Sequence, residues 1–94
     1  MSNKGVPPKT PEISFLDPKE VPANWEGAVK IVGSNFDKGS FALFNGAVPQ
    51  TAFISDSVLE AAVTTEITKQ AGTKDVLVHT SEGLESNTLP FIVK

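Results

Sequence analysis

Val29-Lys30-Ile31-Val32-Gly33-Ser34-Asn35-Phe36 is a short alternating segment that ends in turn residues and a large aromatic ring. In an extended strand, Val29 and Ile31 project to one face and the intervening Lys to the other. Gly33 and Asn35 both accept a left-handed backbone, which a sharp exit from a strand requires. The stretch therefore predicts a half-buried strand and a turn, after which Phe36 folds back over the core.

Short apolar segments of the same kind recur along the chain, separated by turn residues, which is typical of an all-β sandwich. Seven such segments are present, the number in an immunoglobulin-like domain. We predict strands at 12–16, 28–33, 41–45, 51–54, 58–64, 75–80 and 88–93. The intervening segment 17–27 is too rich in Pro and Gly for a helix or an inner strand, so we expect a long crossover between the sheets.

Alternation within these strands predicts which side chains face the core. The inward set is Ile13, Phe15, Val29, Ile31, Leu59, Ala61, Val63, Val76, Val78, Leu89, Phe91 and Val93. Both faces of 41–45 are apolar, so the facing of that strand stays open.

The segment 55–72 fits two structures. It has the Ser or Asp cap and the closing Gly of an amphipathic helix. The β-branched cluster 63–65 favours a strand over 58–64 instead, with a helical turn near 66–71.

The 94 residues suit one compact domain. Residues 1–10 form a Pro-rich lead with almost nothing to bury, and we expect an extended tail there. The predicted domain covers 11–94. With no Cys in the chain, packing alone must stabilise this domain, and thiolate chemistry is excluded.

Charge and hydropathy exclude two classes of partner. The net charge is −3, and all eight basic residues are Lys, spread without a local run, so we expect no nucleic-acid binding. No apolar run approaches the ~20 residues that cross a bilayer, so we expect no membrane insertion.

Residues that could carry chemistry are sparse, and we expect no catalytic, cofactor or metal site. His79 is the only histidine, and the alternation of its strand predicts that it faces outward. The sequence has no nucleophile motif to accompany it. Loop carboxylates are present, but so small a sandwich lacks the deep cleft that glycoside cleavage needs. Asn35 and Asp37 are the best candidates for a calcium site, although turn roles explain them better.

Partner binding is predicted at two places. Trp25 lies in the Pro-rich crossover, where its ring is suited to anchor a protein or stack on a sugar, unless it plugs one end of the core. Pro7 and Pro8 of the tail, together with Pro11 at the start of the domain, form an extended segment suited to docking.

Read in order, these motifs resemble the IPT/TIG family, the immunoglobulin-like type of plexins and transcription factors. The resemblance runs from residue 11 to residue 93. It rests on Pro11, Ile13 and Pro18, on Val29, Ile31, Gly33 and Phe36, on Phe44-Asn45-Gly46, on Ser55 to Ala61, on Gly72 to Val78 and on Ser86 to Phe91. One departure is Thr64, where the family has Pro, which leaves the following turn open.

The resemblance implies an early-set, immunoglobulin-like β-sandwich without catalytic activity. The chain begins with Met and shows neither a signal segment nor Cys, so we expect first a phage virion structural or capsid decoration protein on the virion surface. The alternative is a module of a bacterial cell-surface protein or of a polysaccharide-acting enzyme, outside the cell. The expected partner is a virion or host protein or a surface polysaccharide, and the expected state is a monomer or weak homo-oligomer.

Overall fold

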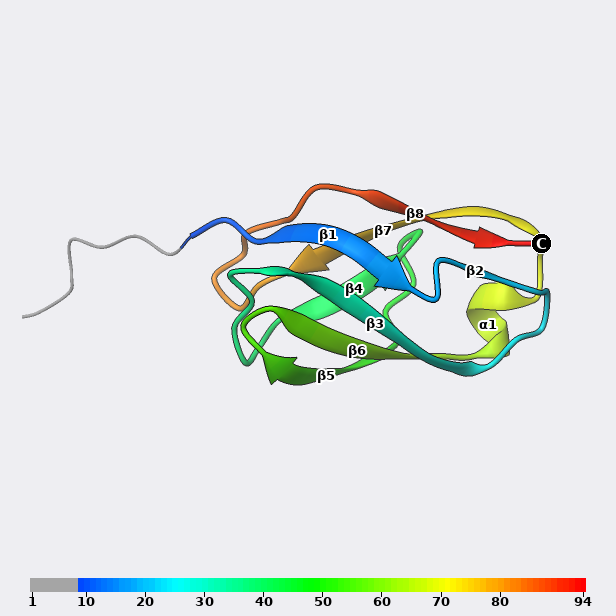
Figure 1. The fold of residues 1–94 in the computed structure, drawn as a ribbon, viewed down its shortest axis with the longest axis horizontal. Coiled ribbons are helices and arrows are strands. Elements are labelled where there is room, and N and C mark those ends of the chain that lie inside the picture. Colours follow the sequence, from blue (N-terminus) through cyan, green and yellow to red (C-terminus); the bar gives the residue numbers. More distant parts are fainter. Residues whose placement is uncertain (1–8) are drawn as a thin grey trace, which may run out of the picture.

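The computed structural model describes residues 9–94, which form two four-stranded sheets packed face to face (Figure 1). The elements in chain order are β1 (Glu12–Asp17), β2 (Glu20–Val21), β3 (Gly27–Ser34), β4 (Phe41–Phe44), β5 (Gln50–Ser55), β6 (Val58–Val63), α1 (Thr65–Thr68), β7 (Gly72–His79) and β8 (Leu89–Val93). No helix of the described part is long and apolar enough to cross a membrane.

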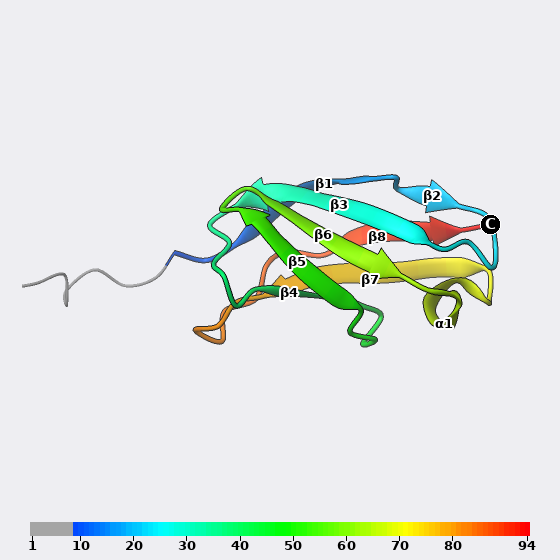
Figure 2. The same cartoon turned by 90° about the horizontal axis from the view of Figure 1, so that it is seen from below.

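The strand order identifies the architecture. One sheet has the order β1-β3-β6-β5 and the other β2-β8-β7-β4, and Figure 2 shows the two layers with their strands crossing at an angle. If the strands are lettered along the chain with β1 and β2 as a split strand A, these are the ABED and GFC sheets of an immunoglobulin-like domain. The predicted immunoglobulin-like β-sandwich is confirmed.

All seven predicted strands are present, with ends that differ by up to three residues. The prediction missed β2, which lies inside the predicted crossover and pairs in parallel with β8. The chain leaves the first sheet at Asp17, passes the cis peptide bond to Pro18, and joins the second sheet at Glu20. A two-residue edge strand buries too little to produce a hydrophobic pattern, so sequence alternation cannot reveal it.

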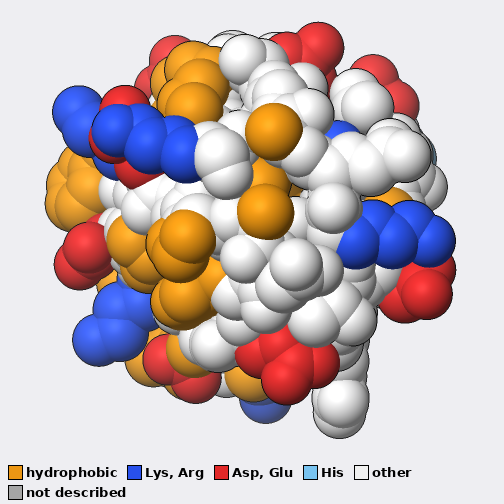
Figure 3. Space-filling view, turned by 90° about the vertical axis from the view of Figure 1, so that its right-hand side faces the viewer, with side chains coloured by type: hydrophobic (Ala, Val, Ile, Leu, Met, Phe, Trp, Pro, Cys, Tyr) orange, Lys and Arg blue, Asp and Glu red, His pale blue; other side chains and the backbone are white. Residues whose placement is uncertain are grey.

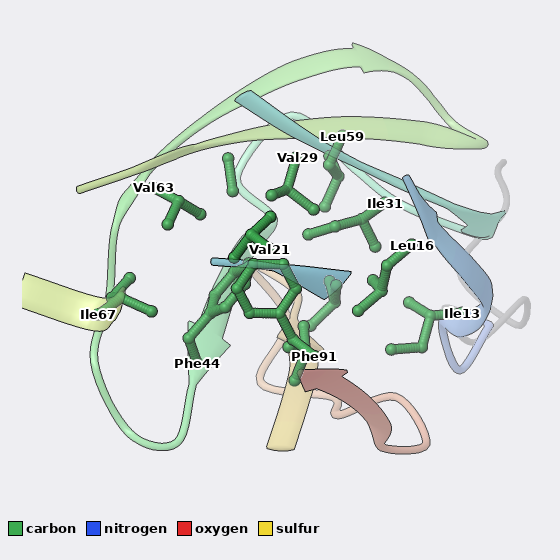
Figure 4. Packing of buried hydrophobic residues seen from close by; sticks show 14 of the residues in the cluster. Ile13, Leu16, Val21, Val29, Ile31, Phe44, Leu59, Val63, Ile67 and Phe91 are labelled. Carbon is green, nitrogen blue, oxygen red and sulfur yellow. The ribbon is translucent and has the colours of Figure 1, made fainter. Parts of the chain in front are cut away.

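The core lies between the sheets and contains ten of the twelve predicted residues in buried positions (Figure 4). The rings of Phe44 and Phe91 meet edge to face at its centre, 5.2 Å apart and at 85°. Phe36 is buried, as expected, and Leu89 packs against the cluster while partly exposed. In β4, whose facing the sequence left open, Ala42 and Phe44 point inward.

The prediction that Phe15 faces the core is wrong, because its side chain is 54% exposed. The pairing of β1 with β3 shifts between Ile13 and Phe15, so Ser14 is an extra residue at a β-bulge. A bulge moves the following residues to the opposite face. Leu16 consequently occupies the core position and Phe15 the surface.

The ambiguous segment contains both structures, with strand β6 followed by the single-turn helix α1. Thr64 stands at the start of α1, where its carbonyl oxygen accepts the N–H of Ile67 at 3.0 Å. Thr68 ends the turn fully buried, and its hydroxyl donates to the carbonyl oxygen of Trp25 at 2.7 Å. The predicted strand and helical turn are thus confirmed.

Gly33 and Asn35 play different parts in the turn after β3. Asn35 has the predicted left-handed backbone, with φ 65°. Gly33 does not, which corrects the prediction. It is required for space instead, because a Cβ at this position would overlap the backbone carbonyl of Glu12.

Candidate functional site

The calcium candidates, Asn35 and Asp37, serve the loops at the end of the sandwich where β1 begins. The carboxylate of Asp37 accepts the N–H of Gly39 at 3.0 Å and the hydroxyl of Ser40 at 3.1 Å. It also accepts the hydroxyl of Ser81 at 2.8 Å, which ties the loop after β3 to the loop after β7. Asn35 donates to the carbonyl oxygen of Thr10 instead.

These hydrogen bonds affect the acidity of Asp37. Desolvation acts to raise the pKa, whereas the hydrogen bonds from Ser81, Ser40 and Gly39 lower it, and together they hold the pKa of Asp37 below its usual value. Across residues 9–94, no three His, Cys, Asp or Glu side chains gather as a ligand set for a metal ion.

His79 lies on the outer face of its sheet with its side chain 30% exposed. Its Nε2 lies 2.8 Å from a carboxylate oxygen of Glu85, and its ring lies 5.5 Å from that of Phe41. The histidine thus joins β7 to the following loop and to β4, at the surface.

Two of the predicted partner residues, Trp25 and Pro11, lie in the described part of the chain. Trp25 is half-buried and packs against the core at the end where α1 and the C-terminus lie. Figure 3 looks onto that end, where hydrophobic side chains lie between basic and acidic ones. Pro11 is fully buried and offers no side-chain surface to a partner. Pro7 and Pro8 lie outside the described residues.

A row of apolar side chains crosses the outer face of the β1-β3-β6-β5 sheet. Phe15 is paired with Val32, and Val32 with Val58. Ile54, at the bulge of β5, continues the row and is 56% exposed. Phe15, Val32, Val58 and Ile54 form what we call the apolar row. Phe15 and Ile54 at the ends of this row are exposed, and Val32 and Val58 between them are partly exposed.

A row of mostly charged side chains runs beside the apolar row, two residues further along each of the central strands β3 and β6. Asp17 is paired with Lys30, Lys30 with Glu60, and Glu60 with Ala52. Beyond it lie the exposed Ala28 and Ala62, which are also paired with each other. The face therefore combines an apolar row, a charged row and a strip of small side chains.

Phe15 also borders a surface hollow where the two sheets meet. The hollow has a volume of about 240 Å³ and is lined by Ser14, Phe15, Leu16, Lys19, Leu89 and Pro90. An exposed aromatic ring beside a proline, a hydroxyl and an ammonium group offers both a stacking surface and hydrogen-bond partners.

Sequence reasoning missed this face because it depends on two bulges. The alternation of β1 assigns Phe15 to the core, and only the extra residue Ser14 turns it outward. A bulge is hidden within the alternating hydrophobic pattern. Its only hint in the sequence is two adjacent residues that are both polar or both apolar and point to the same side.

The fold is shared with solved structures of other proteins, among them the following two. The gamma-CGTase of alkalophilic Bacillus clarkii matches 89% of this chain with a TM-score of 0.73 and 23% identity. A protein of unknown function from Bacteroides thetaiotaomicron matches 94% with a TM-score of 0.71 and 20% identity. This chain spans 12% and 22% of those two chains. Its sequence matches no protein-family model and no curated protein.

Proposed function

We propose that this chain is a non-catalytic immunoglobulin-like module that accompanies a carbohydrate-acting enzyme or another cell-surface protein. The observation that carries the proposal is its likeness to a domain-sized portion of gamma-CGTase. The virion role that the sequence suggested first gains no support from the known structures. The alternative function, with an extracellular location, therefore takes its place.

Membership of the IPT/TIG family is part of the proposal. Several of the motif residues that suggested it have a physical role in the sandwich: Ile13, Val29, Ile31, Leu59, Ala61, Val76, Val78 and Phe91 fill the core, and Gly33 leaves room for the backbone of β1. Gly46 has φ 91° in the turn after β4, a conformation that favours glycine. The resemblance therefore reflects the requirements of this fold at many separate positions.

We also propose that the chain is not catalytic, because its candidate acid–base side chains are engaged in structural hydrogen bonds. The single histidine is bonded to Glu85, and the carboxylate of Asp37 is occupied by loop hydrogen bonds. General acid–base catalysis requires a group free to move a proton at a bound substrate. These groups serve structure, so binding is the activity that the surface supports.

The hollow beside Phe15 is the place where we expect a sugar to bind. Its volume is below the range of enclosed ligand pockets, which suits one sugar ring lying against the exposed face of Phe15. Lys19 and Ser14 supply hydrogen-bond donors at its margin.

Adsorption to insoluble polysaccharide tests the proposal. Purified protein is mixed with granular starch and with cellulose, and the unbound fraction is measured after centrifugation. We expect adsorption to starch, its loss in Phe15→Ala, and its retention in Ile54→Ala, which removes an equally exposed side chain from the opposite edge of the sheet. No adsorption to either polysaccharide would contradict the carbohydrate part of the proposal. Release of reducing sugar from starch would contradict its non-catalytic part.

A further inference from the structure

The outer face of the β1-β3-β6-β5 sheet is complementary to itself. Consider a two-fold axis that lies along the face, parallel to the strands and midway between the central strands β3 and β6. Such an axis places β3 of one copy opposite β6 of the other, and β1 opposite β5. Rotation about this axis keeps each residue at the same height along the strands. A residue of one copy therefore faces the residue of the other copy that lies in the same row, on the symmetry-related strand.

The charged row shows the complementarity most clearly. Lys30 and Glu60 are paired in register, so Lys30 of one copy faces Glu60 of the other, and the same contact occurs twice. Asp17 at the edge faces Ala52, so no like charges meet. A face that presents opposite charges to its own copy at symmetry-related positions favours that copy over other partners.

The other rows fit the same operation. Within the apolar row, Val32 faces Val58. Phe15 faces the bulge of β5, where Ser55 is the residue paired with Val58 and Ile54 is the exposed extra residue beside it. Ala28 faces Ala62, and these small side chains let the two sheets approach closely. Sheets packed with aligned strands are the usual geometry of face-to-face sheet contacts.

The size of the face determines the strength of the contact. Four strands at about 4.8 Å spacing and about six residues of length give a face of about 20 Å by about 20 Å. Two copies would bury about 800 Å² in total, which is below the roughly 1,200 Å² of stable interfaces and within the range of weak, transient contacts. The association is accordingly weak and depends on concentration.

We propose that two copies of this chain associate through this face, with Lys30 of each copy paired to Glu60 of the other. The proposal goes beyond the binding of carbohydrate and rests on Lys30 and Glu60, which lie outside the hollow, whereas Phe15 belongs to both surfaces and would be covered in the dimer. It is a weak, symmetric contact of a kind that brings two host proteins together at a surface.

Sedimentation velocity over a range of concentrations up to about 1 mM, where contacts this small become populated, tests the proposal. We expect the wild-type protein to shift from monomer to dimer. Lys30→Glu and Glu60→Lys should each weaken the dimer about tenfold or more, because like charges then face each other twice. These two changes move the net charge in opposite directions, so a general charge effect would strengthen one of them.

Mixing the two variants provides the decisive test of the contact between Lys30 and Glu60. In a mixed pair, the two Glu side chains at positions 30 and 60 of the Lys30→Glu copy each face a Lys of the Glu60→Lys copy, so a heterodimer should form where neither variant pairs with itself. Lys38→Glu, the same charge change in an exposed loop away from the face, is the control and should dimerise as the wild type does. Thermal unfolding of each variant verifies that it is folded.

Two results would overturn the proposal: a wild-type protein that stays monomeric throughout, or folded variants that do not pair when mixed. Starch adsorption measured on Lys30→Glu separates the two proposals. If adsorption persists while dimerisation is lost, the carbohydrate function does not require the dimer contact.

Discussion

The side chain of Asn87 hydrogen-bonds both backbone groups of Ile13, 74 residues away in the sequence. Its Oδ1 accepts the N–H of Ile13 at 2.8 Å, and its Nδ2 donates to the carbonyl oxygen of Ile13 at 3.0 Å. β1 is an edge strand, so one side of its backbone has no strand to pair with. Asn87 supplies the missing partner just before the bulge at Ser14, and so ties the first strand to the loop that leads into β8.

Asn87→Ala is therefore expected to destabilise the domain by about 1–2 kcal/mol, since two backbone groups lose their partner. Chemical denaturation followed by tryptophan fluorescence measures the change. Thr88→Ala, at the next and exposed position, is the control and should change the free energy of unfolding by less than about 0.5 kcal/mol. Equal effects of both variants would show that the paired contact with Ile13 is not what stabilises β1.

Gly33→Ala is expected to be more severe. The added Cβ would overlap the backbone carbonyl of Glu12, so β1 must move away from β3. Because backbone cannot yield as a flexible side chain does, we expect a loss of about 2 kcal/mol or more. Ser34→Ala, at the next position of the same strand, is the control, and its free energy of unfolding should stay close to that of the wild type.

Truncations distinguish the core from the apolar row. Ile31→Ala and Phe91→Ala remove fully buried side chains and should each cost about 2–5 kcal/mol in denaturation experiments. Phe15→Ala removes a ring that is 54% exposed, and its cost should stay below about 1 kcal/mol. A cost for Phe15→Ala as large as that for Phe91→Ala would mean that the ring lies in the core.

Periodicity is sufficient to predict most of this fold. The central strands alternate without interruption, so Val29 and Ile31 in β3 and Val76 and Val78 in β7 are buried as their parity requires. The edges are less regular. A bulge at Ser14 reverses the facing of Phe15, and β2 consists of only two paired residues. Edge strands commonly carry such irregularities, which protect them from pairing with other chains.

The candidate site was harder to predict for the same reason. Val32 and Val58 become neighbours on the surface only through the register between β3 and β6. The order of residues within one strand does not determine that register. A large aromatic in a loop, such as Trp25, is conspicuous in the sequence, whereas the alternation of its segment assigns Phe15 to the core. Rare residue types are visible in a sequence, but cross-strand neighbours become visible only when the sheet is assembled.

The final prediction concerns the stability of the loop end at low pH. Hydrogen bonds from Ser81, Ser40 and Gly39 outweigh desolvation and lower the pKa of Asp37 in the folded protein. A carboxyl group with a lower pKa when folded than when unfolded stabilises the fold above the unfolded pKa of about 3.9. This contribution is lost as the pH falls through the folded pKa, because the protonated group no longer accepts these bonds as strongly.

We therefore expect Asp37→Ala to be less stable than the wild type at neutral pH, and the difference in free energy of unfolding to shrink as the pH falls below about 4. Urea denaturation at a series of pH values measures both. Ser81→Ala removes the shortest of these hydrogen bonds, at 2.8 Å, while the carboxylate remains, and should reproduce part of the neutral-pH loss. Asp56→Asn, at an exposed position in the neighbouring turn, is the control for removing one acidic charge from this end. A difference between wild type and Asp37→Ala that is the same at every pH would show that the charge of Asp37 does not stabilise the loops, and that its contacts act through shape alone.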